Sequence, residues 1–311
     1  MLWNLFNQLP DYCAWYEPLH PNLLTHIKYV KPKEDHIGID DYWRNYAALP
    51  DLAQHHQSAF GQNTLFMEKY VKWTELEDYI NYLIANSQGK IPVLQFNRMD
   101  LRLGWLKNTF PNATIIHIKR QPYPLWLSCR KHLPTMACKV NESHPDAYDL
   151  MQWSADLSLT FPMLQAKKNR HSYYRHYFIW KLAQLIADGS ADVFLRLEED
   201  FHHSSQGLEK LAQLFNWSAE NKKLAQTFIL QPEPNQLLDE KTEVQQAIEQ
   251  QVDAQFAALG LTSYLPSSPL MSTKLENKKA WLKYPQNPEI TVAELLEAIK
   301  FQKDEMTALV N

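Results

Sequence analysis

The feature that most constrains the fold is a short apolar run that ends at an arginine and leads into a proline. The residues from Thr114 to Ile118 are apolar and partly β-branched, which is typical of a strand buried on both faces of a sheet. The run ends at the basic pair Lys119-Arg120, and Pro122 suits the first turn of a helix. This order predicts a strand, a cation at its carboxyl end, and a helix directly afterwards.

The same segment predicts an anion site. Open α/β sheets bind ligands at the carboxyl ends of their strands, and the N–H groups at a helix N-terminus favour anions. Arg120 and the hydroxyl of Ser128, less than two helical turns beyond Pro122, can hold one phosphate between them. Spacing alone leaves an alternative, a surface arginine at a strand end and a solvated serine on its helix.

This segment resembles the 3′-phosphate-binding motif of the PAPS-dependent sulfotransferases, in which an arginine ending a strand and a serine eight residues later bind the nucleotide's 3′-phosphate. Residues 101–111 resemble the helix and "phenylalanine-proline" turn that precede the motif, and residues 192–201 resemble the later strand with its acidic "YEDL"-type end. Leu197 stands in place of that motif's tyrosine, so no adenine contact is implied there. The likeness spans roughly residues 1 to 218.

The resemblance implies an α/β fold, with a parallel β-sheet flanked by helices as in P-loop-like sulfotransferases. It implies PAPS as co-substrate, 3′-phosphoadenosine 5′-phosphate as product, and no metal. Residues 1–231 are expected to form this domain, and residues 232–311 a mainly helical extension. Within the extension, residues 236–260 and 291–309 predict helices. The sequence leaves open whether the extension packs on the domain or forms a homo-oligomer contact.

No glycine-rich phosphate loop occurs in the sequence. Its seven glycines stand alone, and neither G-x-x-x-x-G-K-[ST] nor G-x-G-x-x-G is present. Residues 2–10 resemble the helix that follows the family's N-terminal phosphate loop, and residues 11–20 resemble the strand and loop after it. We therefore expect that the sequence start is set too late. The alternative is an inactive nucleotide-binding or interaction protein that has lost its first strand and loop.

Sulfonyl transfer to a hydroxyl needs a general base, in-line geometry and cations around the transferred group. Cytosolic sulfotransferases use a histidine near the position of Arg98, and an arginine cannot take up a proton at neutral pH. Glu17, in Tyr-Glu-Pro-Leu-His, resembles the glutamate of carbohydrate-type and bacterial members, and its aromatic neighbours should raise its pKa. His20 is the second candidate base, and Arg98 is expected to contact the sulfonyl group or the acceptor. The alternative for Glu17 is an exposed glutamate at a turn, and the alternative for Arg98 is a structural ion pair.

Composition narrows the function further. A net charge of -4 and a pI near 6.3 argue against a dedicated nucleic-acid binder. The resemblance implies a small-molecule or carbohydrate acceptor. Cys13, Cys129 and Cys138 lack metal or redox spacing, which favours a reducing compartment. No apolar run is long enough for a membrane span, and a cytoplasmic location is expected. The many Trp and Tyr residues predict core packing, and the pair His55-His56 predicts solvated surface.

Overall fold

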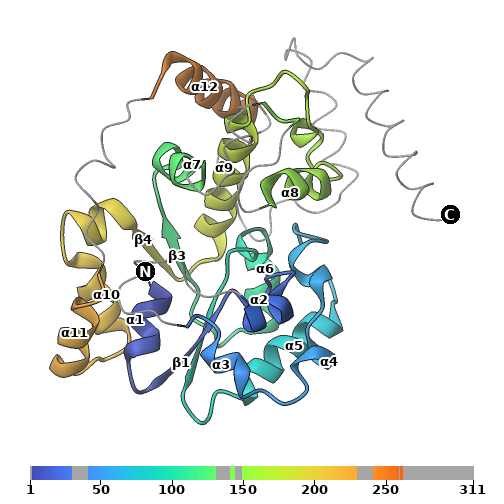
Figure 1. The fold of residues 1–311 in the computed structure, drawn as a ribbon. Helices are drawn as coiled ribbons and strands as arrows, with labels where there is room; N and C mark the ends of the chain where they lie inside the picture. Colours follow the sequence, from blue (N-terminus) through green and yellow to red (C-terminus); the bar gives the residue numbers. More distant parts are fainter. Residues whose placement is uncertain are drawn as a thin grey trace.

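A computed structural model describes residues 2–29, 41–130, 141–143, 149–229, 241–258 and 260–261. Among these residues, four short strands alternate with helices, as Figure 1 shows. Strand β1 (Tyr12–Tyr16) runs parallel to β2 (Ile91–Gln95), and β3 (Ile116–Lys119) runs parallel to β4 (Val193–Arg196). The predicted α/β class with parallel strands is confirmed. The described strands form two two-stranded sheets, whereas a single sheet was expected.

The helices follow the apolar periodicity of the sequence. The helices are α1 (Leu2–Gln8), α2 (Leu23–Tyr29), α3 (Arg44–Ala47), α4 (Leu52–His55), α5 (Thr74–Ala85), α6 (Leu103–Thr109), α7 (Pro122–Arg130), α8 (Leu150–Leu157), α9 (Tyr173–Ser190), α10 (Gln206–Leu214), α11 (Ala219–Gln226) and α12 (Glu243–Ala258). Short 3₁₀ turns lie at Ser58–Gly61, Asp100–Arg102 and Pro162–Leu164, and a π-turn at Leu197–His202 follows β4. The helix predicted at 291–309 lies outside the described residues.

Helices cover both faces of the strands. Because side chains alternate along a strand, Ala14 and Leu195 face a cluster that contains α1, α10 and α11. Trp15 faces the opposite cluster, to which α5, α6 and α9 contribute. Both strand pairs contribute to the cluster beneath α1, so both belong to one layer between helices. The predicted packing role of the aromatic residues is confirmed by these clusters.

Strand β3 is less buried than its apolar sequence predicts. Ile118 is 38% exposed, and so is Phe194 of the neighbouring strand β4. The expectation of burial on both faces was therefore wrong for β3. A sheet of only two strands gives the covering helices a narrow surface to pack on, and within the described residues β3 has no second neighbour.

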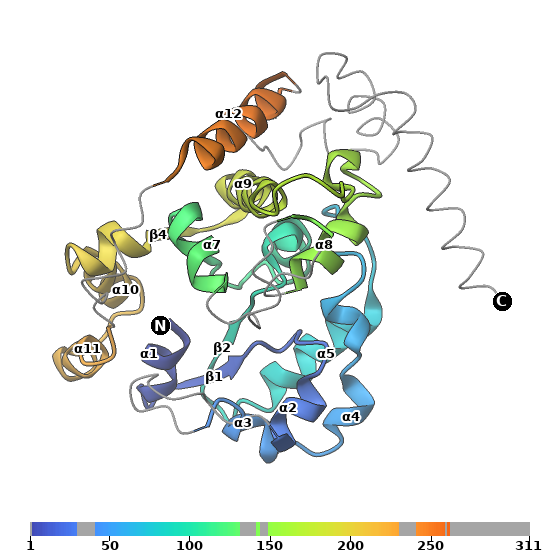
Figure 2. The ribbon, with the colours of Figure 1, turned by 45° about the horizontal axis from the view of Figure 1, so that its top comes forward.

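Helix α12, from the predicted C-terminal extension, packs along α9. Figures 1 and 2 both show the two helices side by side. The Tyr174 hydroxyl donates to Gln255 at 2.8 Å, and the rings of Phe178 and Phe256 lie 5.0 Å apart. Of the two open alternatives, this part of the extension packs on its own chain. The boundary at residue 231 and the oligomer contact stay predictions.

One histidine prediction was wrong. His56 is 7% exposed rather than solvated, because its ring lies 3.1 Å from the carbonyl oxygen of His20 and packs edge-on against Phe60 and Tyr79. His176, on α9, is also buried and lies 3.0 Å from the carbonyl oxygen of Pro122. Burial lowers the pKa of each imidazole to about 4, so both are neutral in the folded protein at pH 7.

We predict that mild acid destabilises the fold through these two histidines. The folded pKa lies below the ordinary value of 6.5, so the unfolded chain takes up protons first and stability falls as the pH drops from 6.5 toward 4. Between pH 6.5 and 5 each histidine should cost about 1.5 kcal/mol of unfolding free energy. Urea denaturation measures this. His176→Gln, whose amide can still donate to Pro122, should reduce the drop by the contribution of one histidine, and an unchanged drop contradicts the explanation.

Candidate functional site

The candidate site begins where β1 ends. Glu17 directly follows the strand and has a positive φ of 40°, which is strained for a residue other than glycine. Only 8% of the residue is exposed. The predicted burial of this carboxylate is confirmed, and the alternative of an exposed glutamate at a turn is wrong. Strained backbone that the surrounding structure maintains is a common mark of functional positions.

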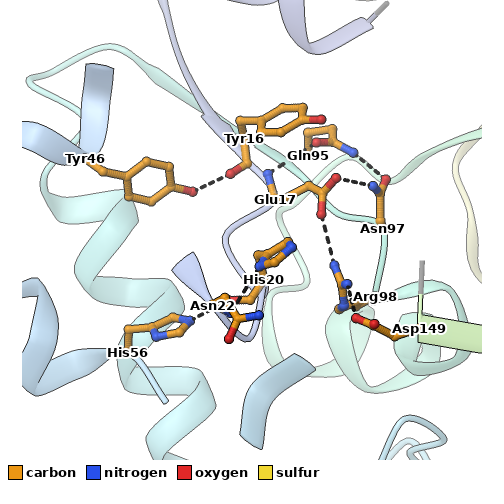
Figure 3. A network of polar contacts seen from close by, with 10 residues as sticks. All are labelled: Tyr16, Glu17, His20, Asn22, Tyr46, His56, Gln95, Asn97, Arg98 and Asp149. Atoms are coloured by element: carbon orange, nitrogen blue, oxygen red, sulfur yellow. Dashed lines mark hydrogen bonds and ion pairs between the residues drawn. The ribbon is translucent and has the colours of Figure 1, made fainter. Parts of the chain in front are cut away.

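Contacts from other elements hold the loop that carries Glu17. Three side chains lie at carbonyl oxygens of this loop. Tyr46 on α3 donates to Tyr16 at 2.9 Å, Tyr79 on α5 donates to Pro18 at 2.9 Å, and His56, just after α4, lies 3.1 Å from His20. Gly61 packs so closely that a Cβ there would lie 2.1 Å from the carbonyl oxygen of Leu19. The loop is therefore fixed before any ligand binds. Figure 3 shows the contacts that Tyr46 and His56 make with this loop.

Residues after β2 bind the Glu17 carboxylate. Arg98 Nη1 donates to Glu17 Oε2 at 3.0 Å, and the side-chain amide of Asn97 donates to Oε1. Gln95 Oε1 accepts the backbone N–H of Glu17 at 3.2 Å, and Gln95 Nε2 donates to Asn97 Oδ1 at 2.6 Å. The parallel register pairs Tyr16 with Gln95, which brings both strand ends to one edge.

The guanidinium of Arg98 lies between two carboxylates. Its Nη2 is 3.2 Å from Asp149 Oδ2, at the start of α8, and its Cζ lies 5.8 Å from the ring centroid of Trp153. Arg98 is 6% exposed. The sequence predicted Arg98 and Glu17 for one site, and the structure brings them together. The sequence did not predict Gln95, Asn97 or Asp149 for this site, because their roles depend on strand register and on the packing of α8.

The two candidate bases differ in proton affinity. Burial raises the pKa of Glu17 above its ordinary value, although the charge of Arg98 opposes this effect. Burial, reinforced by the charge of Arg98, lowers the pKa of His20 to about 3. A base works best when its pKa lies near the operating pH, so Glu17 suits proton transfer and His20 does not. His20 Nδ1 already accepts the backbone N–H of Asn22 at 3.1 Å.

The predicted anion site lies at the carboxyl end of β3. The strand ends at Lys119, Arg120 follows, and α7 begins at Pro122, so this part of the prediction is confirmed. Arg120 Nε lies 4.0 Å from Glu198 Oε1, and that same oxygen accepts the N–H of Gln121 at 3.2 Å. Ser128 is half-buried on α7, and no hydrogen bond joins it to Arg120 within the described residues.

The part of the chain that the structure describes holds no group of three or more His, Cys, Asp or Glu residues suited to a metal ion. In the same ranges, no helix combines the length and the apolar character that crossing a bilayer requires. Cys13 and Cys129 are buried free thiols, and Cys138 lies outside the described residues. The cytoplasmic location stays a prediction.

Comparison with known proteins does not assign the chain to a family. No family model matches the chain, and neither a curated protein nor a solved structure is similar enough to count as a match. The chemistry of the site therefore rests on its own residues.

We predict that Asn97→Ala raises the pKa of Glu17 further. The amide donates to the ionised carboxylate, and a hydrogen bond to a charged group contributes about 1.5–3 kcal/mol. Carbon-13 NMR titration of glutamate carboxyls measures the shift. Asn108→Ala, on the exposed side of α6, is the matched control and should leave the Glu17 titration unchanged. A Glu17 pKa that is equal in all three proteins contradicts this account of the contact.

Proposed function

We propose that this protein is a PAPS-dependent sulfotransferase that transfers a sulfonyl group to a hydroxyl, or an amine, of a small-molecule or carbohydrate acceptor. The observation that carries the proposal is the sequence of elements β3, Arg120 and α7. A permanent cation stands at the carboxyl end of a parallel strand, at the start of a helix in which Tyr123, between Pro122 and Pro124, carries the one N–H of the first three residues. Both features favour a phosphate group.

Arg120 is well placed to bind the 3′-phosphate. Trp180 on α9 donates to its carbonyl oxygen at 3.0 Å, which fixes the backbone, while the side chain stays 29% exposed. Its contact with Glu198 is long, at 4.0 Å, so the guanidinium keeps donors for a ligand. Ser128, on the helix that follows, would add a hydroxyl.

Glu17 and Arg98 would act at the sulfonyl end. The carboxylate of Glu17 would accept the acceptor's proton, and Arg98 would face the acceptor. Gln95 and Asn97 hold the carboxylate in one orientation, which removes the need to order it during reaction. The raised pKa of Glu17 strengthens it as a base relative to an ordinary carboxylate.

The expected first strand also has a suitable place. Among the described residues, β2 pairs only with β1 and β3 pairs only with β4, yet both pairs belong to one layer. A strand inserted between β2 and β3 would pair with both free edges and join the two sheets into one parallel sheet. The two parallel pairs are therefore compatible with one larger, sulfotransferase-like parallel sheet.

The alternative is a catalytically inactive nucleotide-binding or interaction protein of the same fold. The absence of a glycine-rich loop from the printed sequence favours it, because nothing recognisable there would hold the 5′-phosphosulfate. The coding sequence upstream of Met1 distinguishes the two. An in-frame strand followed by a basic loop rich in Gly, Ser or Thr favours the enzyme, and a genuine start at Met1 favours the inactive protein.

We predict that Arg120→Ala weakens binding of 3′-phosphoadenosine 5′-phosphate by about 1.5–3 kcal/mol, the contribution of a hydrogen bond to a charged group. Ser128→Ala should weaken it by about 1 kcal/mol. Isothermal titration calorimetry measures both. Arg196→Ala removes another strand-end arginine, which pairs with Glu199 and is 59% exposed, and should leave affinity unchanged. Unchanged affinity in Arg120→Ala would remove the main support for the assignment.

We predict that Glu17→Gln, in a chain extended upstream by its phosphate loop, binds nucleotide normally but loses kcat by about 10²–10⁴-fold. Glutamine keeps the size of the carboxylate and can accept one of the two hydrogen bonds that Asn97 and Arg98 donate, but it cannot accept the proton. His20→Gln is the control from the same loop and should keep most of the activity. Full activity in Glu17→Gln would refute the role of base. The 311-residue chain alone should turn over poorly, and steady-state sulfonation assays measure all four proteins.

A further inference from the structure

Two buried N–H groups beside Glu17 have no acceptor. Arg98 Nε and Trp153 Nε1 are inaccessible and lack a hydrogen-bond partner within the described part of the chain. Arg98 is 6% exposed and Trp153 9%. A buried donor without a partner costs about 1–3 kcal/mol, so native proteins keep few of them. Two such donors on neighbouring side chains indicate that an oxygen atom beside each would be favourable.

The two donors belong to one cluster. The Arg98 guanidinium lies over the indole of Trp153, with Cζ 5.8 Å from the ring centroid. Trp153 comes from the first turns of α8, and Asp149 at the start of that helix binds the same guanidinium. Asp149 has a positive φ of 60°, so both carboxylates that hold Arg98 sit on left-handed backbone. The arrangement fixes Arg98 and leaves Nε unused.

Local charge decides which oxygen suits these donors. One guanidinium faces the carboxylates of Glu17 and Asp149, at 3.0 and 3.2 Å, so its charge is already matched. His20 and His26 add no positive charge at pH 7, because burial and Arg98 lower the pKa of each. A phosphate or carboxylate on the ligand would be repelled by two nearby carboxylates, and an uncharged oxygen would not.

We propose that Arg98 Nε and Trp153 Nε1 donate to an uncharged, hydroxyl-bearing acceptor, so that the site takes neutral alcohols and sugars and rejects acceptors that carry an anionic group there. This rests on the proposed function. In the reaction, the hydroxyl proton moves to Glu17 as the acceptor oxygen forms a bond to sulfur. The bond from sulfur to the 5′-phosphate oxygen breaks, and its electron pair stays on that phosphate.

The test compares two sugars that differ in one charge, methyl β-glucoside and methyl β-glucuronide, by saturation-transfer NMR titration of the 311-residue protein. We expect the neutral sugar to bind with an affinity at least about tenfold higher. Trp153→Phe keeps the ring and removes the N–H, and should weaken binding of the neutral sugar about fivefold or more. Trp126→Phe, on α7, is the matched control and should change nothing. Asp149→Asn removes one carboxylate and should reduce the difference in binding affinity between the two sugars.

Equal or tighter binding of the glucuronide, or an unchanged affinity in Trp153→Phe, overturns the inference, and so does binding of neither sugar. Circular dichroism checks that each variant is folded. Titration with 3′-phosphoadenosine 5′-phosphate on the same samples separates this inference from the proposed function. Nucleotide binding together with a preference for the glucuronide refutes only the neutral acceptor. Selective binding of the neutral sugar without nucleotide binding refutes only the sulfotransferase.

Discussion

The ion pair between Glu17 and Arg98 is the interaction on which the rest of the candidate site depends. Both side chains are almost completely buried, and burial of two charges is costly unless hydrogen bonds satisfy them. Asn97 and Asp149 supply those bonds, and each comes from a different element. Removing either partner would leave an uncompensated buried charge. The pair therefore ties the ends of β1 and β2 to the start of α8, and it explains why three distant segments converge there.

Parallel pairing makes this convergence possible. The register of β1 and β2 sets Tyr16 opposite Gln95, so the residues that follow each strand emerge at the same edge. Glu17 then needs a left-handed backbone to turn its side chain inward, and Gly61 allows the loop to be covered closely. A β-carbon at position 61 would enter the Leu19 carbonyl. Sheet register, one strained residue and one glycine are together sufficient to place a carboxylate in a dry environment.

Much of this was predictable from the sequence, and the remainder has a physical reason. Apolar runs and Pro122 predicted β3 and α7, because strand burial and helix starts depend on local residue types. The burial of Glu17 followed from its aromatic neighbours. The burial of His56 did not, because it depends on a carbonyl acceptor far away in the sequence. Asp149 was missed for the same reason, and the exposure of Ile118 depends on the width of the sheet.

Arg98 and Arg120 differ in how closely the carboxylates of the protein neutralise their charge, and this difference suggests a different role for each. Arg98 is 4% exposed at its side chain and holds two carboxylates at 3.0 and 3.2 Å. Arg120 is 29% exposed at its side chain and has one carboxylate at 4.0 Å. A dianionic phosphate gains most from a cation whose charge is not yet matched, which is why we propose Arg120 for the phosphate. Arg98 is already held by Glu17 and Asp149, which is why we propose an uncharged oxygen as the ligand beside it.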